Sequence, residues 1–273
     1  MSEVVVVIGA GGIGAAIARR HGIGKTVLLA DCNPATLDAA VEALREASYV
    51  VEARSTDVTS RASLRSLADH ATGLGAVVAV VNAAGLSPNM APPGRILAVD
   101  LYGAALIFEE FERVVAAGGA GLVVSSMAGH MLPLPAEQEK ALAYAPTDDL
   151  PSLPFLRAIT SSGDAYMVAK RANILRAQAA AMTWGDRGAR VNSISPGIVS
   201  TPLAQHEFKS ESGPIYRAFL DASSAKRMAP PDEIALAASY LLGPESAFIN
   251  GSDLLIDGGV IAAMRAGRLP SPA

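Results

Sequence analysis

The chain has 273 residues, of which 51% are hydrophobic and 18% charged, and its formal net charge is −4 at pH 7. A chain of this length and apolar content can bury a large core, which excludes intrinsic disorder. Its Lys and Arg residues are scattered and outnumbered by acids, which argues against a nucleic-acid partner.

Short β-branched runs alternate with longer alanine-rich segments along the chain. This alternation predicts a parallel sheet with helices on both faces, and the nearly all-apolar runs indicate strands that are covered on both sides. Without a repeat or linker, we expect one domain over residues 1–273, a doubly wound Rossmann-type α/β fold with a seven-stranded sheet. The predicted strands are Val4–Ile8, Thr26–Ala30, Val50–Arg54, Val77–Val81, Gly121–Ser125, Arg190–Ile194 and Asp253–Asp257. The predicted helices are Gly12–Arg20, Pro34–Ala47, Ser60–His70, Arg95–Ala117, Asp164–Asp186 and Asp232–Leu242.

Two segments interrupt this alternation, and both follow the carboxyl end of a predicted strand. They span about residues 127–163 and 201–228. Ligands bind at the carboxyl edge of an open parallel sheet, and long segments there build pockets or interfaces. We interpret the first segment as an insertion and the second as a substrate lid.

A glycine-rich turn joins the first predicted strand to the first helix. Gly9, Gly11 and Gly14 satisfy the pattern G-x-G-x-x-G, with Gly12 and Ile13 between them. Glycine lets the backbone turn sharply and approach a pyrophosphate, to which the helix N-terminus offers N–H groups. The turn therefore predicts a dinucleotide site.

An acid ends the second predicted strand and bears on the choice of dinucleotide. Asp31 follows Gly11 by about 20 residues, the spacing of an acid that binds the adenosine ribose. A carboxylate there would repel a 2′-phosphate, so NAD is predicted and NADP is disfavoured. The alternative is that Asp31 caps the next helix, although Asn33 is better placed for that role.

Tyr166 and Lys170 lie four residues apart near the start of a predicted helix, so they share one of its faces. A lysine ammonium favours the phenolate form of a nearby tyrosine, which would let the tyrosine exchange protons near neutral pH. This spacing is common, and an ordinary surface pair would have it too.

The order of several motifs removes that ambiguity, because the chain resembles the short-chain dehydrogenase/reductase family over nearly its whole length. The resemblance rests on Gly9–Gly14, Asp57-Val58, Asn82-Ala83-Ala84-Gly85, Ser125-Ser126, Tyr166 with Lys170, and Pro196-Gly197. It implies hydride transfer between the cofactor and an alcohol or ketone carbon.

The resemblance also implies a role for each motif. Ser126 would bind the substrate oxygen, Tyr166 would transfer the proton, and Lys170 would bind the nicotinamide ribose. The remaining implied cofactor contacts are Asp57 and Val58 at the adenine, Asn82, Ala83 and Gly85 along the central strands, and Pro196, Gly197, Ile198 and Thr201 at the nicotinamide.

The chain departs from the family pattern at two places. The glycine turn is one residue shorter than usual, and Ile8 stands where the family has threonine. Asp100 stands where the family has a catalytic asparagine, whose backbone carbonyl holds a water beside the lysine. An ionised Asp100 near Lys170 would keep the lysine charged and partly offset its effect on Tyr166. Alternatively, Asp100 faces a backbone amide and changes little, and we expect activity to be retained.

Within the family, residues 256–265 and the 40-residue gap from Ser126 to Tyr166 are similar to the bacterial hydroxysteroid dehydrogenase/carbonyl reductases. In those relatives the extra segment is helical and blocks the usual four-helix association surface. We expect a homo-oligomer, either a dimer or a tetramer. The apolar residues of the two long segments predict a hydrophobic or ring-bearing substrate, a hydroxysteroid among the candidates, although they would equally suit an interface.

The sequence supports other functions less well. A dinucleotide-binding sensor without catalysis is the main alternative, and Asp100 is the one feature in its favour. No Cys/His cluster has the spacing of metal ligands, and His130 is left unassigned. The single cysteine, Cys32, the acid before the first apolar run and the lack of a run of membrane-spanning length predict a cytoplasmic protein.

Overall fold

A computed structural model describes residues 2–210 and 212–269, and its centre is a seven-stranded parallel sheet. The strand order is β3-β2-β1-β4-β5-β6-β7, so the order reverses between β1 and β4. The predicted doubly wound Rossmann-type fold is thus confirmed. The strands are β1 (Glu3–Ile8), β2 (Thr26–Asp31), β3 (Val50–Ser55), β4 (Ala76–Asn82), β5 (Val115–Val124), β6 (Arg190–Pro196) and β7 (Asp253–Ile256).

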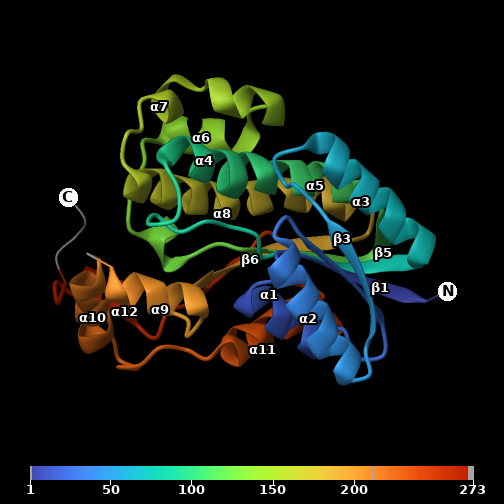
Figure 1. The fold of residues 1–273 in the computed structure, drawn as a ribbon. Coiled ribbons are helices and arrows are strands. Elements are labelled where there is room, and N and C mark those ends of the chain that lie inside the picture. Colours follow the sequence, from blue (N-terminus) through green and yellow to red (C-terminus); the bar gives the residue numbers. More distant parts are fainter. Residues whose placement is uncertain (1, 211, 270–273) are drawn as a thin grey trace.

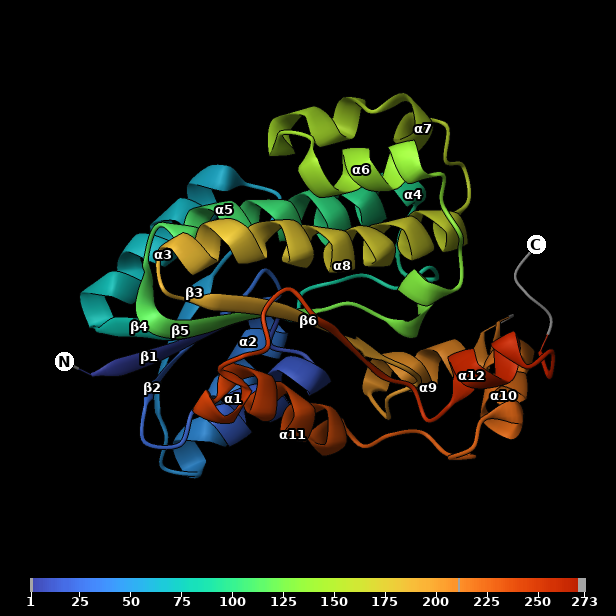
Figure 2. The same ribbon diagram turned by 180° about the vertical axis from the view of Figure 1, so that it is seen from behind.

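Each face of the sheet packs against its own layer of helices (Figures 1 and 2). Along β1 the side chains alternate, so Val4, Val6 and Ile8 enter one core while Val5 and Val7 enter the other. One face is covered by α3 (Arg61–Leu74), α5 (Ala104–Glu112) and α8 (Ser162–Asp186), and the other by α1 (Gly12–His21), α2 (Pro34–Glu46) and α11 (Pro231–Leu242), which η4 (Pro244–Ser246) follows. Burial on both sides explains why the strands read as nearly continuous apolar runs.

The single helix predicted over Arg95–Ala117 is wrong in its extent and regularity. The structure has α4 (Pro93–Ile96), a π-helix η1 (Leu97–Gly103) and α5 in succession. The last of these ends at Glu112, and β5 begins at Val115, where it pairs with Val77 of β4. Pairing with a neighbouring strand overrides the helical preference of the alanines that follow, and Gly118, with φ of +81°, fits the irregular part of that strand.

The predicted insertion begins with η2 (Met127–His130) and continues with α6 (Ala136–Tyr144), η3 (Thr147–Ser152) and α7 (Pro154–Arg157). It forms an extra layer outside α8 and η1 (Figure 1). Leu142 and Leu150 are fully buried there, and the guanidinium of Arg171 on α8 pairs with Glu139 of α6 at 2.6 Å. The insertion is therefore packed onto the outer side of the helix that carries Tyr166.

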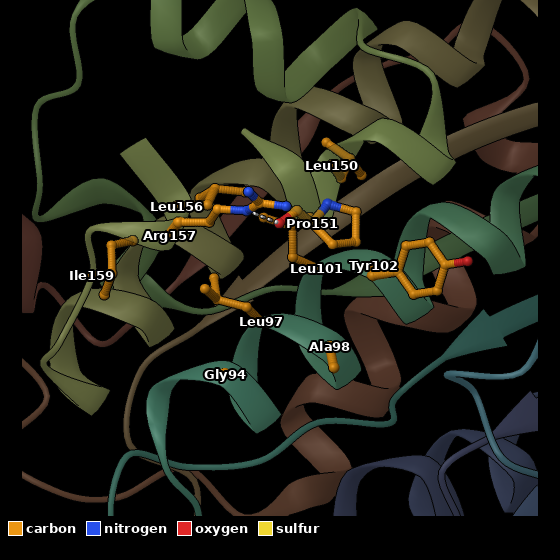
Figure 3. Close-up of a pocket in the computed structure, with 10 residues that line it drawn as sticks. All are labelled: Gly94, Leu97, Ala98, Leu101, Tyr102, Leu150, Pro151, Leu156, Arg157 and Ile159. Carbon is orange, nitrogen blue, oxygen red and sulfur yellow. Dashed lines mark hydrogen bonds between the residues drawn. The ribbon is translucent and has the colours of Figure 1, made fainter. Parts of the chain in front are cut away.

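A small cavity of about 250 Å³ remains between the insertion and η1. Figure 3 shows Leu97 and Leu101 of η1 on one side and Leu150 and Pro151 on the other. The guanidinium of Arg157 donates from Nε to the Pro151 carbonyl at 3.3 Å. We interpret this cavity as a gap between two packed elements and not as a substrate site. Its lining is mainly apolar and includes none of the predicted catalytic residues.

The predicted lid contains α9 (Pro202–Lys209) and α10 (Gly213–Ala222), which lie beside the C-terminal helix α12 (Val260–Arg265) at one end of the sheet (Figure 1). Phe208, Tyr216 and Phe219 pack there against Met127 and Ile198. Within the described part of the chain, no helix has the length and apolarity needed to span a membrane.

Candidate active site

The glycine turn lies at the carboxyl end of β1, next to the point where the strand order reverses. Gly9 has φ of +94°, and a Cβ there would lie 2.4 Å from the Ala84 amide nitrogen. A Cβ on Gly14 would lie 1.9 Å from the Gly9 carbonyl oxygen, whereas a Cβ on Gly11 would meet nothing within 4 Å. Two glycines thus allow close backbone packing, and Gly11 leaves open space at the N-terminus of α1. That space fits a pyrophosphate.

The Asp31 carboxylate is hydrogen-bonded to the glycine turn. Its Oδ2 accepts a hydrogen bond from the Ala10 N–H at 2.8 Å, and its Oδ1 accepts one from the Asn33 N–H at 2.8 Å. Asn33, as the sequence suggested, caps α2 by accepting from the Ala35 and Thr36 amides. Asp31 is therefore fixed at the carboxyl edge of β2 beside the turn, and it is not the helix cap.

The next predicted residues lie along the same edge. The N–H and hydroxyl of Thr59 donate to Asp57 Oδ1 at 2.9 and 2.7 Å and hold the pKa of that carboxyl below its ordinary value. Val58 is buried, and a Cβ on Gly103 would lie 3.0 Å from its Cγ2. The Ala84 N–H donates to Asn82 Oδ1 at 3.2 Å, which shapes the turn over residues 82–85 against Gly9.

A cavity of about 400 Å³ is lined by two of the predicted catalytic residues, Ser126 and Tyr166. Ser126 follows β5 and caps η2, with its Oγ accepting from the Ala128 N–H at 3.1 Å. Tyr166 lies on the first turns of α8, and Lys170 Nζ is 5.4 Å from the centre of its ring. Ser126 and Tyr166 line the cavity together with five predicted cofactor contacts: Ile13, Pro196, Gly197, Ile198 and Thr201.

Lys170 is almost fully buried and is held by three groups. Its Nζ lies 3.2 Å from Asp100 Oδ2 and donates to the Val124 carbonyl at 3.3 Å, while the Ser125 hydroxyl donates to the Lys170 carbonyl at 2.7 Å. Burial alone would lower the pKa of the ammonium, but the Asp100 carboxylate raises it above its ordinary value. Lys170 therefore stays charged beside Tyr166.

Both sequence-based interpretations of Asp100 describe part of its surroundings. Its Oδ1 accepts from the Leu86 N–H at 2.8 Å, and its Oδ2 faces Lys170. Burial raises the pKa of this carboxyl, although Lys170 and the Leu86 amide oppose the rise. A Cβ on Gly85 would lie 3.0 Å from Asp100 Oδ2 and 3.1 Å from Lys170 Nζ, so glycine leaves room for the ion pair.

Asn173 was missed by the sequence interpretation. With its amide nitrogen facing the neighbouring carbonyls, Nδ2 donates to the Asp100 carbonyl at 2.7 Å and to the Ala169 carbonyl at 3.3 Å. The carbonyl that was expected to hold a water beside the lysine thus bonds to Asn173, while the Asp100 side chain contacts the lysine directly. The available signal was an amide three residues after Lys170, on the same face of the helix.

The rest of the cavity wall is mainly apolar or aromatic. It includes Met127, Met131, Leu203, Phe208, Ile215 and Phe219, with Ser87, Glu207 and Tyr216 as further polar residues. Ser87 and Glu207 were also missed, because Ser87 lies in an irregular loop and Glu207 lies on a lid helix that carries no family motif. Tyr216 contacts Phe208, with ring centres 5.8 Å apart.

Two residues left unassigned lie outside this cavity wall. His130 Nε2 is 2.8 Å from Asp253 Oδ2, which also accepts from Ser195, so its partner is on β7. Cys32 is exposed as a free thiol. Among residues 2–210 and 212–269, no three His, Cys, Asp or Glu side chains are arranged to hold a metal ion.

Comparison with known proteins agrees with this fold. Residues 3–136 match the family model described as short chain dehydrogenase, and residues 152–261 match the one described as Enoyl-(Acyl carrier protein) reductase. A short-chain dehydrogenase/reductase of Alternaria brassicicola is 39% identical over 95% of this chain and 96% of its own. Galactitol 2-dehydrogenase of Cereibacter sphaeroides is 30% identical over 93% and 92%. A solved short-chain dehydrogenase/reductase from Serratia marcescens, 23% identical, shares the fold with a TM-score of 0.75 over 95% and 98% of the two chains.

Fold and site define a Rossmann-type dinucleotide-dependent oxidoreductase. The chain belongs to the short-chain dehydrogenase/reductase family, whose members use NAD(P) and act on CH–OH groups. The narrower resemblance to the hydroxysteroid branch needs correction. The 3-alpha-hydroxysteroid dehydrogenase/carbonyl reductase of Comamonas testosteroni is 27% identical over 81% of this chain, well below the 39% of the Alternaria protein. A similar C-terminus and a long gap before the tyrosine do not by themselves define that branch.

Proposed function

We propose that the protein is an NAD-dependent dehydrogenase that interconverts a secondary alcohol and its ketone, with an apolar or ring-bearing substrate. The observation that carries this proposal is that Ser126 and Tyr166 line one cavity beside the glycine turn, with the buried Lys170 next to the Tyr166 ring. The aromatic residues Phe208, Tyr216 and Phe219 on the cavity wall can pack against a ring of the substrate.

In this proposal each residue acts on a stated atom. The Ser126 hydroxyl binds the substrate oxygen, and the Tyr166 phenolate removes the hydroxyl proton as the alcohol becomes a ketone. Lys170, kept charged by Asp100, stabilises the phenolate and holds the nicotinamide ribose. A bound NAD⁺, held by the glycine turn and Lys170, would supply the acceptor for the hydride that leaves the carbinol carbon.

The choice of NAD is carried by Asp31. Its carboxylate, fixed by the Ala10 and Asn33 amides, would accept bonds from the ribose hydroxyls and repel a 2′-phosphate. We expect kcat/KM with NAD⁺ to exceed that with NADP⁺ by at least about a hundredfold, as like charges cost several kcal/mol. Asp31→Ser should narrow this ratio below about tenfold. Initial rates with both cofactors measure it, and a wild-type preference for NADP⁺ would contradict the assignment.

Substitutions at two glycines of the turn distinguish an effect on cofactor binding from an effect on folding stability. Gly11→Ala places its methyl in open space, so the thermal midpoint should stay within about 2 °C while NADH affinity falls at least about tenfold. Gly14→Ala drives its methyl into the Gly9 carbonyl, so we expect a loss of about 2–3 kcal/mol in the free energy of unfolding. Fluorescence titration with NADH and urea unfolding measure the two effects. Unchanged affinity in Gly11→Ala would place the pyrophosphate elsewhere.

The reaction itself is tested by following reduced nicotinamide absorbance with a panel of cyclic and open-chain secondary alcohols. We expect turnover with NAD⁺ and highest kcat/KM for ring alcohols. NADH binding without turnover of any secondary alcohol, and without reduction of the matching ketones, would contradict the proposed activity.

We also propose that the protein is a homodimer. The insertion covers the outer side of α8 through Leu142, Leu150 and the Arg171–Glu139 pair, which leaves that helix unavailable for a four-helix contact with a second copy. One further self-complementary surface gives a dimer. Light scattering should report twice the mass of the chain, and a tetramer would show that a second face associates.

A further inference from the structure

Glu207 is a buried carboxylate in the wall of the proposed substrate cavity. It lies on α9 of the lid, yet only 4% of its surface is exposed. The Ser87 hydroxyl donates to its Oε1 and the Asn89 side-chain amide donates to its Oε2, both from the loop after β4. Burying a carboxylate is costly unless it is hydrogen-bonded, so this group is held in place by fixed donors.

These donors leave acceptor capacity on the carboxylate. An ionised carboxylate offers about four lone-pair positions, and Ser87 and Asn89 occupy two of them. Glu207 and Ser87 both line the cavity, whereas Asn89 lies behind them. The Ser87 oxygen can also accept a hydrogen bond, since its own proton is donated to Glu207.

Tyr216 connects this polar pair to the reacting end of the cavity. Its ring lines the cavity, and its pKa is raised by burial, then by the Glu207 carboxylate and by Tyr166. Glu207 and Tyr166 line the same cavity, so one substrate that fills it can contact both groups. A ring with two polar substituents is such a substrate.

We propose that Glu207, together with Ser87, binds a second hydroxyl of the substrate, so that the preferred substrates are diols with an apolar ring or chain between the two hydroxyls. The inference rests on the proposed function, because it assumes that the alcohol is oxidised at Tyr166. A hydroxyl supplies one donor, for which the carboxylate still has a lone pair, and the negative charge would reject a substrate with a carboxylate at that end. The 30% identical galactitol 2-dehydrogenase is named for a substrate that carries more than one hydroxyl.

A simpler role for Glu207 is that of a latch, which closes the lid onto the loop after β4. The Asn89 amide also donates to Ser210 Oγ at 3.1 Å, so three hydrogen bonds join the lid to the loop. A latch alone would affect every substrate to the same degree. Recognition of a second hydroxyl affects only the substrates that carry one, and this difference decides between the two roles.

The test uses three alcohols that share one cyclohexane ring and differ in the group opposite the reacting hydroxyl: cyclohexanol, cyclohexane-1,4-diol and 4-hydroxycyclohexanecarboxylate. With full-length enzyme and NAD⁺, we expect kcat/KM for the diol to exceed that for cyclohexanol by about 10- to 100-fold, as for a hydrogen bond to a charged group. The carboxylate should be the poorest of the three. Calorimetry with the enzyme–NADH complex should show the same order of affinity, which gives a readout that does not need turnover.

Glu207→Gln should bring the diol-to-cyclohexanol ratio below about threefold and raise the carboxylate relative to cyclohexanol by about tenfold. Glu139→Gln, on α6 outside the cavity, is the matched control and should leave all three ratios unchanged. An unchanged diol preference in Glu207→Gln, an equal loss for all three alcohols, or a stronger preference for 4-aminocyclohexanol than for the diol would overturn the inference. If none of the alcohols is oxidised but the diol still binds more tightly in a Glu207-dependent way, the proposed reaction fails and the recognition stands.

Discussion

Tyr166→Phe is expected to lower kcat/KM for alcohol oxidation by about 10²- to 10⁴-fold, the range that positioned acid–base groups contribute. The change removes one oxygen atom from a side chain that faces the cavity and whose ring lies 5.4 Å from Lys170 Nζ. Phenylalanine keeps the ring packed but cannot take the proton from the substrate. NADH affinity should stay within about threefold, because the cofactor contacts of the turn and of Lys170 remain.

The control for this change is Tyr144→Phe, since Tyr144 lies exposed on α6 and far from the proposed chemistry. Its kcat/KM should match that of the wild type. Thermal midpoints of both variants should lie within about 2 °C of wild type, because neither change leaves a buried polar group unpaired. Residual activity above about one tenth of wild type in Tyr166→Phe would mean that another group transfers the proton.

Much of the fold could be predicted because local patterns and the global architecture agree. In β1 the strictly apolar run of four valines and an isoleucine satisfies both faces of a covered parallel strand. The prediction failed where tertiary contacts outweighed local preference. The pairing of Val115 with Val77 begins β5 within the segment assigned to a helix, and the π-helix at Leu97–Gly103 has no signal in the apolar spacing.

The residues of the candidate site differ in the same way in how far the sequence could predict them. Groups tied to one turn or one helix face, such as Gly9, Gly14 and the Tyr166–Lys170 pair, could be found from spacing and resemblance. Groups that depend on contacts between distant segments could not. Glu207 meets Ser87 from about 120 positions away along the chain, and nothing in the sequence near either residue indicates the other. Two alternatives for Asp100 followed from the sequence, and only the fold shows that one of its oxygens accepts from the Leu86 amide while the other faces Lys170.

The buried Asp100–Lys170 pair predicts the largest effect on stability. Lys170→Met should lower the free energy of unfolding at pH 7 by about 3–5 kcal/mol, because it leaves the Asp100 carboxylate, 1% exposed, without its counter-charge. The double variant Asp100→Asn/Lys170→Met should be more stable than Lys170→Met alone, since an asparagine needs no counter-charge and its oxygen can still accept from the Leu86 amide.

The pH dependence of these variants gives an independent check. Burial raises the pKa of Asp100 above its unfolded value of 3.8, so the folded state binds a proton more readily than the unfolded chain. Stability of Lys170→Met should therefore increase relative to the double variant as the pH falls from 7 towards 5. The raised pKa of Lys170 acts in the same direction at higher pH: it stabilises the wild type fully below 10.5 and ceases to do so as the pH rises above the folded value.

Urea unfolding at pH 5, 6 and 7 measures the stability loss and the pH dependence that Asp100 causes, with Lys140→Met on the exposed side of α6 as the matched loss of a lysine. That control should change the free energy of unfolding by at most about 0.5 kcal/mol. A cost below about 1 kcal/mol for Lys170→Met, or a double variant less stable than the single one at pH 7, would show that Asp100 is already protonated in the fold. In that case the carboxyl could not hold Lys170 charged. The role proposed for this pair in stabilising the Tyr166 phenolate would then be contradicted.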